Sequence, residues 1–346
     1  MGKRREPEDL SVHELIEGPT EILSSETLDA IRRPEAAGAD LSVEQTHDLT
    51  ASAAEVTSDL SGDRPAGRER VELARMPAAG ALYRRAALGA LPGLGRGRRG
   101  NDLPAVEFTV AGVRTDRARL ADYDRVCGFR LTDRLPATFP HVLGFPLTLR
   151  LMTAPGFPIP LTGVVHVGNR ITVHRPITAD EALDFTTFAQ ELRPHDRGRQ
   201  VDVVLVGSVD GEEVWRGVST YLGRDRTPGG RDRDERPPAP AATARWRVEP
   251  RVGTEYARVS GDHNPIHTSR LGARLFGFRR PIAHGMWSKA RCLAALETRL
   301  PDAYTVEVAF KLPVPLPSTV DFTLLPDGAF ALHDSHGRPH LAGLVR

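Results

Sequence analysis

Two stretches of this chain repeat one another, and this repeat constrains the fold more than any other feature of the sequence. Residues 123–128, Tyr-Asp-Arg-Val-Cys-Gly, align with residues 256–261, Tyr-Ala-Arg-Val-Ser-Gly. Residues 171–176 and 308–313 align at nearly the same offset, and both end in proline. A repeat at a fixed offset indicates that one supersecondary unit has been duplicated. The sequence therefore predicts two structurally similar halves.

The two halves are expected to share one order of elements, in which helices precede an antiparallel meander. In the first half we expect a strand, two helices and four strands, over residues 106–110, 116–126, 139–152, 164–173, 183–192, 200–209 and 213–222. Pro146 weakens the prediction of the second helix. In the second half we expect a strand, a helix and four strands, over residues 245–252, 284–300, 304–310, 319–325, 329–333 and 341–345. This order is typical of the α+β class.

Composition divides the chain into four segments. Residues 1–75 hold 17 acidic against 9 basic residues and no Phe, Trp or Tyr, so this segment has little apolar surface to bury. We expect either a disordered acidic extension or a translation start at Met76. Residues 76–223 and 243–346 are the expected folded halves. Residues 224–242 are rich in Arg, Asp, Pro and Gly and are expected to form a linker.

The composition also argues against several classes of partner. The most apolar stretch, residues 142–167, is interrupted by Arg150 and by prolines, so we expect no membrane span. The arginine-rich loop at 93–100 lacks interleaved aromatic residues, so we expect no nucleic-acid partner. Cys127 and Cys292 form no disulfide or metal-ligand spacing, and no apolar stretch follows the basic N-terminus. A cytoplasmic protein is expected.

Residues 260–267, Ser-Gly-Asp-His-Asn-Pro-Ile-His, carry the strongest chemical signal. Gly261 and Pro265 are turn formers, so a loop displaying Asp262 and His267 is expected here. A carboxylate and an imidazole on one short loop can act on one proton or one water. Taken alone, the Gly-Asp-x-Asn-Pro fragment is more typical of a surface turn, and a single histidine near a helix start is more typical of a capping or solvated residue.

A helix is expected to open at His284 and Gly285 and to stop at Pro301. The first N–H groups of a helix have no intrahelical acceptor and favour negative charge. Gly285 has no side chain, so a carbonyl oxygen can approach its amide closely. An acid/base pair beside such an amide suits proton abstraction next to a carbonyl group.

Taken together, the string from Tyr256 to Trp287 resembles the signature of the MaoC-like hydratases and dehydratases, which include (R)-specific enoyl-CoA hydratases. The close match covers residues 256–317. The resemblance implies a hot-dog fold, in which an antiparallel sheet wraps a long central helix. Combined with the repeat, it implies a tandem (double) hot-dog, which is a pseudo-dimer within one chain and leaves a true homodimer open.

The two copies of the repeat differ at the motif. The first half continues with Phe129, Arg130 and Leu131 where the second half has Asp262, His263 and Asn264. The chain therefore resembles double hot-dog members of the family in which a degenerate N-terminal half supports a catalytic C-terminal half and helps to shape an acyl-binding tunnel.

The resemblance also implies roles for individual residues. The catalytic group consists of Asp262, His267 and, as oxyanion donor, Gly285. The substrate-binding candidates are Ser260, Asn264, His284, Arg279 and Arg280. Ser260 and Asn264 are also typical of residues that order a loop. Arg279 and Arg280 are suited to phosphates of coenzyme A or of a carrier prosthetic group, and equally to an exposed loop.

The implied activity is the reversible hydration of trans-2-enoyl thioesters, or dehydration of (3R)-3-hydroxyacyl thioesters, in fatty-acid or related acyl metabolism. The substrate would arrive as an acyl-CoA or acyl carrier protein thioester. No metal or redox cofactor is expected, because the histidines lack zinc-ligand spacing and no glycine-rich nucleotide motif follows a strand. A hot-dog acyl-thioesterase and a non-catalytic acyl-thioester-binding partner subunit remain alternatives.

Overall fold

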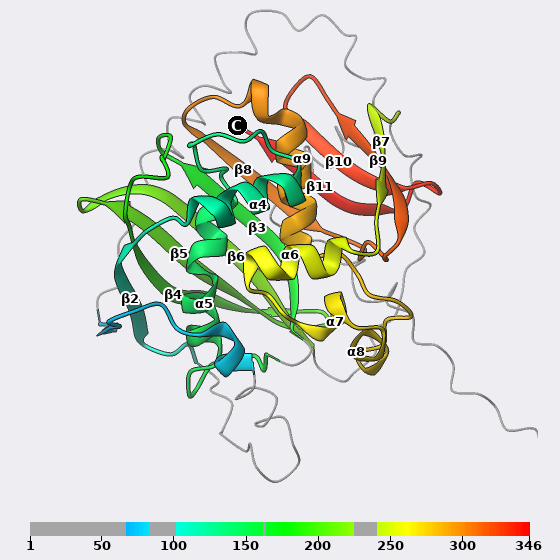
Figure 1. Ribbon diagram of the computed structural model, residues 1–346. Coiled ribbons are helices and arrows are strands. Elements are labelled where there is room, and N and C mark those ends of the chain that lie inside the picture. The colour runs from blue at the N-terminus through cyan, green and yellow to red at the C-terminus, as the bar shows by residue number, and fades with distance from the viewer. Residues whose placement is uncertain (1–66, 84–101, 162–163, 225–240) are drawn as a thin grey trace, which may run out of the picture.

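The structure is a computed structural model that describes residues 67–83, 102–161, 164–224 and 241–346 (Figure 1). Most of the acidic segment, the arginine-rich loop at 93–100 and most of the expected linker at 224–242 lie outside the described residues. Within the described ranges, no helix is long and apolar enough to cross a membrane.

The described strands form one continuous sheet, in the order β1-β2-β4-β5-β6-β3-β8-β11-β10-β9-β7. The first half supplies β1 (Glu69–Glu72), β2 (Val106–Val113), β3 (Val165–Val173), β4 (Leu183–His195), β5 (Gly198–Val209) and β6 (Glu212–Arg224). The second half supplies β7 (Ala244–Val248), β8 (Tyr304–Phe310), β9 (Ser318–Leu324), β10 (Ala329–Asp334) and β11 (Pro339–Val345). The halves join where β3 pairs antiparallel with β8, with Ile171 opposite Val306.

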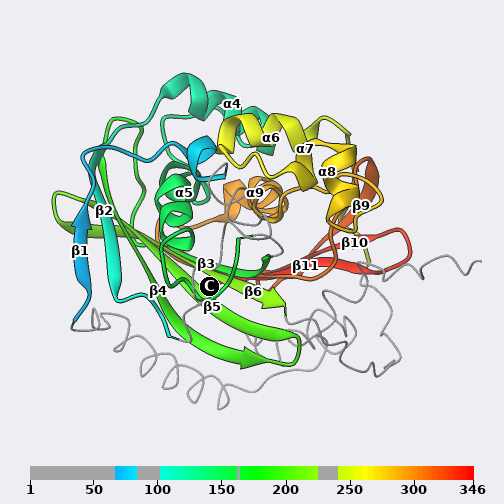
Figure 2. The same cartoon turned by 90° about the horizontal axis from the view of Figure 1, so that it is seen from below.

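The helices lie on one side of this curved sheet (Figure 2). The first half contributes α4 (Arg117–Cys127) and α5 (Phe139–Met152). The second contributes α6 (Val252–Ser260), α7 (Pro265–Thr268), α8 (Arg270–Leu275), α9 (Gly285–Leu296) and the short 3₁₀ helix η3 (Glu297–Arg299). Both α5 and α9 lie directly against the sheet, as the central helices of the two halves.

The sequence repeat corresponds to the paired helices α4 and α6. Each aligned hexapeptide ends its helix at a glycine in the left-handed region, Gly128 with φ 85° and Gly261 with φ 80°. The aligned tyrosines, Tyr123 and Tyr256, meet with ring centroids 6.1 Å apart. The internal similarity read from the sequence is therefore present in space, and its two copies pack against each other.

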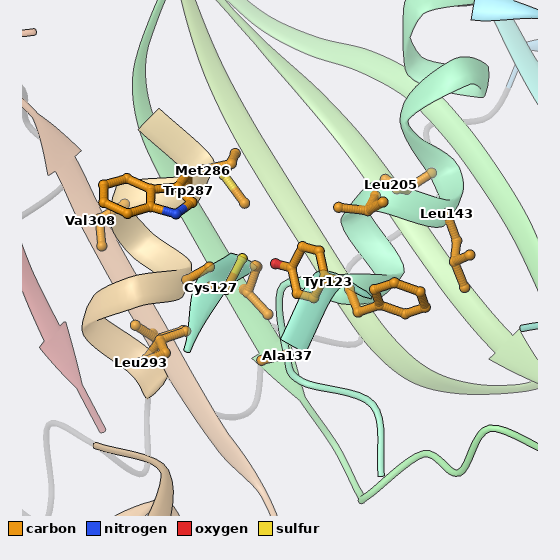
Figure 3. Close-up of a cluster of buried hydrophobic side chains, with 14 of the residues drawn as sticks. Tyr123, Cys127, Ala137, Leu143, Leu205, Met286, Trp287, Leu293 and Val308 are labelled. Carbon is orange, nitrogen blue, oxygen red and sulfur yellow. The ribbon is translucent and has the colours of Figure 1, made fainter. Parts of the chain in front are cut away.

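Both halves share one hydrophobic core. Figure 3 shows Tyr123 and Cys127 of α4 beside Met286, Trp287 and Leu293 of α9. The Trp287 indole N–H donates to the Val126 carbonyl at 3.0 Å, which ties the helices together. Because apolar side chains from both halves exclude water from the same space, the two halves stabilise each other.

Lys289 of α9 is fully buried and links the two halves through hydrogen bonds. Its Nζ donates to the Asn169 carbonyl at 3.1 Å, to Asn169 Oδ1 at 2.6 Å and to the Val306 carbonyl at 3.1 Å. Asn169 belongs to β3 and Val306 to β8. All three ammonium donors are therefore matched by acceptors at the junction of the two half-sheets.

Most expected elements are confirmed, one expected strand is shorter than predicted, and one described strand lies ahead of the expected first half. The strand expected over 245–252 ends at Val248, because Pro250 breaks the ladder and α6 begins at Val252. The helix expected over 139–152 is confirmed as α5: Pro146 lies inside it without ending it, since most of the helix is buried against the core. The described structure also begins ahead of Met76: β1 pairs parallel with β2 through backbone hydrogen bonds, which require no aromatic residues.

Candidate active site

The motif occupies the connection between α6 and α7. Gly261 ends α6, and Asp262 then leaves the helix axis. Ser260 Oγ accepts from the Asp262 N–H at 3.2 Å, and Asp262 Oδ1 accepts from the Asn264 N–H at 3.2 Å. The Asn264 side chain in turn caps α7 by accepting from the Ile266 N–H. Two of the expected substrate-binding residues, Ser260 and Asn264, thus hold the turn in shape.

His267 lies on α7, not on the loop that the sequence predicted. A proline at the first helical position and the Asn264 cap together favour one helical turn here. His267 Nδ1 is 2.8 Å from the Ile282 carbonyl oxygen. Because a carbonyl only accepts, Nδ1 carries the proton and Nε2 keeps a free lone pair. The imidazole is therefore oriented as a base.

His284 completes a cluster with the predicted pair. It is the N-cap residue of α9, and its ring stacks on that of His267 with centroids 3.7 Å apart. His284 Nε2 is 3.0 Å from the Asp262 carbonyl oxygen and 3.9 Å from Asp262 Oδ2. One ligand atom from each of Asp262, His267 and His284 lies within 4.8 Å of the others. Asp262 and His284, which are 22 positions apart in the sequence, thus lie next to each other.

Gly285 is the first residue of α9, immediately after His284. Its N–H belongs to the first turn of the helix, where backbone N–H groups have no intrahelical acceptor. A Cβ at this position would lie 3.1 Å from the Phe310 ring, which is tighter than an ordinary contact. Glycine therefore keeps Phe310 close and leaves the amide uncovered by a side chain.

Tyr83 is a member of the site that the sequence did not reveal. It ends the described part of a helical segment at 79–83, and its hydroxyl donates to Asp262 Oδ1 at 2.5 Å. The two residues are 179 positions apart, and no motif connects them. The only signal in the sequence is that Tyr83 is the first aromatic residue of the chain.

The first half also contributes a wall of aromatic and imidazole rings. The His166 ring lies 4.7 Å from Tyr221, 5.0 Å from Phe310 and 6.4 Å from His141, measured between centroids. Phe310 is the residue that contacts Gly285. The half that lacks the motif therefore borders the site through His141, His166 and Tyr221.

The protonation states suit base catalysis. Burial opposes ionisation of Asp262, but His284, His267 and the hydrogen bonds from Tyr83 and Asn264 outweigh it and lower the pKa of this carboxyl. Burial lowers the pKa of His267, and it lowers the pKa of His284 to about 3. Near neutral pH the site thus holds a carboxylate and neutral imidazoles.

The remaining two candidates lie on the segment between α8 and α9. Arg279 and Arg280 are both exposed. Arg280 Nη1 donates to the Pro317 carbonyl at 3.4 Å. Both residues lie on the surface, and neither belongs to the buried cluster.

Comparison with known proteins gives consistent likenesses. The family model described as MaoC like domain matches residues 228–332. The chain is 39% identical to the 3-hydroxyacyl-thioester dehydratase X of Mycobacterium tuberculosis over 270 residues, which cover 76% of this chain and 95% of that protein. It is 28% identical to the enoyl-CoA hydratase ChsH3 of the same organism, over 52% of this chain and 66% of that protein.

Solved structures give the same result. The crystal structure of HtdX from Mycobacterium tuberculosis superposes with a TM-score of 0.63 at 38% identity, covering 69% of this chain and 98% of that chain. A MaoC-like dehydratase from Phytophthora capsici superposes with a TM-score of 0.58 at 19% identity, covering 71% and 96%. These likenesses confirm the predicted α+β, tandem hot-dog fold.

Proposed function

The chain belongs to the MaoC-like dehydratases, and on that premise we propose that Asp262 and His267 catalyse the reversible hydration of trans-2-enoyl thioesters to (3R)-3-hydroxyacyl thioesters. The protein is a hydro-lyase that acts on acyl thioesters of fatty-acid metabolism. The observation that carries the proposal is the convergence of an ionised carboxylate, a neutral imidazole and a free helix-terminal amide.

The geometry supports different roles for the two oxygens of the Asp262 carboxylate. Oδ1 accepts from Tyr83 and from the Asn264 N–H, so Oδ2 remains for a water. His267 Nε2 offers the second acceptor. In hydration the pair removes a proton as the water oxygen bonds to C3, and it then returns a proton to C2 on the same face. Water is added across the double bond, and the enzyme recovers its starting protonation state.

Gly285 acts on the thioester carbonyl group of the substrate. As C3 is attacked, the thioester carbonyl oxygen gains enolate charge, and the Gly285 N–H donates to it. The positive end of α9 adds to this stabilisation. One donor of this kind contributes about 10² to 10³ in rate.

Tyr83 and His284 act as positioning residues in this proposal. The Tyr83 hydroxyl stays protonated, because burial and Asp262 both raise its pKa. It therefore holds one carboxylate oxygen in place throughout the reaction. His284 packs on the His267 ring and holds the Asp262 backbone, so that acid and base keep their spacing. The proposed chemistry uses no metal ion and no redox cofactor.

The test follows the absorbance of the enoyl-thioester band with crotonyl-CoA and with a longer trans-2-enoyl-CoA. Wild type is expected to hydrate at least one of them. Asp262→Asn and His267→Ala are each expected to lose about 10² to 10⁴ in kcat while keeping the wild-type unfolding temperature. Release of free CoA instead would indicate a thioesterase. Equal rates in wild type and both variants would refute the site assignment.

A further inference from the structure

The short helix α8 exposes large apolar side chains to solvent. Leu271, Leu275 and Phe276 are 70%, 77% and 44% exposed. Among the described residues, only one other large apolar side chain, Leu131 at 61%, is comparably exposed. A monomeric protein that keeps such side chains together on its surface commonly uses them to bind a partner.

The packing of α8 explains why these side chains point outward. Its inner face is formed by Gly272 and Ala273, which are buried. A Cβ at Gly272 would lie 2.5 Å from the Pro265 side chain, so α8 packs too closely on α7 for a larger residue. The leucines must therefore occupy the outer face.

The charged residues of this segment all have one sign. Arg270, Arg274, Arg279 and Arg280 are all exposed, and residues 269–280 contain no Asp or Glu. We define Leu271, Leu275 and Phe276 with these four arginines as the α8 surface. An apolar centre with a basic rim is complementary to an acidic protein surface that also carries apolar side chains.

The α8 surface borders the active site. It follows α7, which carries His267, and the chain then runs from Arg280 to His284 and Gly285. The Ile282 N–H donates to the Ile266 carbonyl at 3.2 Å, so both ends of this segment are held beside the catalytic residues. Figure 2 shows α8 next to α7 on the helical side of the sheet. A partner bound here would lie beside the site.

We propose that the α8 surface is the docking site of an acidic acyl carrier protein, which delivers the acyl group on its phosphopantetheine arm. This inference rests on the proposed function. Phosphates of free coenzyme A would pair with Arg279 and Arg280, but they would leave Arg274 and the three apolar side chains without a partner molecule. An acidic carrier protein would contact both the arginines and the three apolar side chains.

The first experiment measures binding directly, so it does not depend on activity. Fluorescence anisotropy follows a labelled holo-carrier protein titrated with wild type, with Leu271→Ser/Leu275→Ser and with Arg274→Glu. Each variant is expected to weaken binding by about tenfold or more. Matched controls, Leu131→Ser and Arg299→Glu, alter an exposed leucine and an exposed arginine elsewhere and are expected to bind as wild type does.

The second experiment compares the crotonyl group on the carrier with crotonyl-CoA. The α8 variants are expected to lose kcat/KM on the carrier substrate, mainly through KM, and to keep their rate on crotonyl-CoA. Added salt should weaken the carrier reaction more than the CoA reaction. Equal losses on both substrates, or wild-type binding by both variants, would overturn the proposal.

Two further outcomes are distinguishable. Carrier binding that depends on α8, without turnover of either substrate, would support docking and refute the proposed activity. Wild type that ignores the carrier but sediments with vesicles containing phosphatidylglycerol, through the same leucines, would overturn the proposal in favour of a membrane surface.

Discussion

The Tyr83 hydroxyl lies 2.5 Å from Oδ1 of Asp262 and donates a hydrogen bond to it. The bond joins a helical segment that precedes the first central helix to the Asp262 motif of the second half. It makes the environment of the Asp262 carboxylate depend on both halves of the chain.

Replacing Tyr83 with Phe should therefore change the pH profile of the enzyme. The hydrogen bond is one of the interactions that lower the pKa of Asp262, so its loss raises that pKa. Since the base must be ionised, the acidic limb of the kcat/KM profile moves to higher pH, and kcat falls by about tenfold. Tyr304→Phe, at the start of β8, is the control. A lower rate with an unmoved acidic limb would contradict this role.

Adding one methyl group at Gly285 should displace the oxyanion donor. In Gly285→Ala the new Cβ meets the Phe310 ring, so either the ring or the start of α9 must shift. We expect kcat to fall by about 10² with a much smaller change in KM. The double variant Gly285→Ala/Phe310→Leu removes the obstacle and should recover part of the lost rate. No recovery, in a protein that remains folded, would show that the contact with Phe310 is not the cause.

Asp124 of α4 should make stability depend on pH. It is 1% exposed, and neither carboxylate oxygen has a hydrogen-bond partner among the described residues. Burial, and then Glu297, raise its pKa to about 7. A pKa raised above the unfolded value means that its contribution to stability is complete below the unfolded pKa and is lost as pH rises through about 7.

Asp124→Asn removes the charge that must be buried at high pH. We expect it to raise the free energy of unfolding by about 2 kcal/mol above neutral pH and to change little at acidic pH. Urea unfolding across the pH range measures this difference. The substitution Asp122→Asn, at a partly exposed carboxylate that pairs with Arg125, should show no such pH-dependent gain. An equal effect of Asp124→Asn at all pH values would contradict the assigned ionisation.

Metal removal should leave the activity intact. The donor atoms of Asp262, His267 and His284 are close enough to hold an ion, but the proposed reaction uses two of these groups for proton transfer. We expect full activity after dialysis against EDTA, inhibition by added zinc and recovery when EDTA is added again. Loss of activity on chelation alone would require a metal-dependent mechanism in place of the proposed one.

Local sequence patterns predicted most of the fold. Helices α4 and α9 and the strands after them follow from apolar periodicity and turn residues, which act within a few positions. Predictions were weaker where the local signals were short. A proline and an asparagine cap suffice for the single turn of α7, whereas the turn residues of this stretch predict a loop. Strand β1 has no aromatic residue and forms by pairing with β2.

The sequence by itself determined the double architecture and the order of elements, and it predicted an acid, a base and a glycine close together along the chain, because these features depend on local sequence. Only the tertiary structure decided what surrounds them. Tyr83, His166 and Phe310 reach the site because β3 pairs with β8 and both halves close over one core. Such contacts join residues that are far apart in sequence, and their geometry is set by packing, which no local pattern encodes.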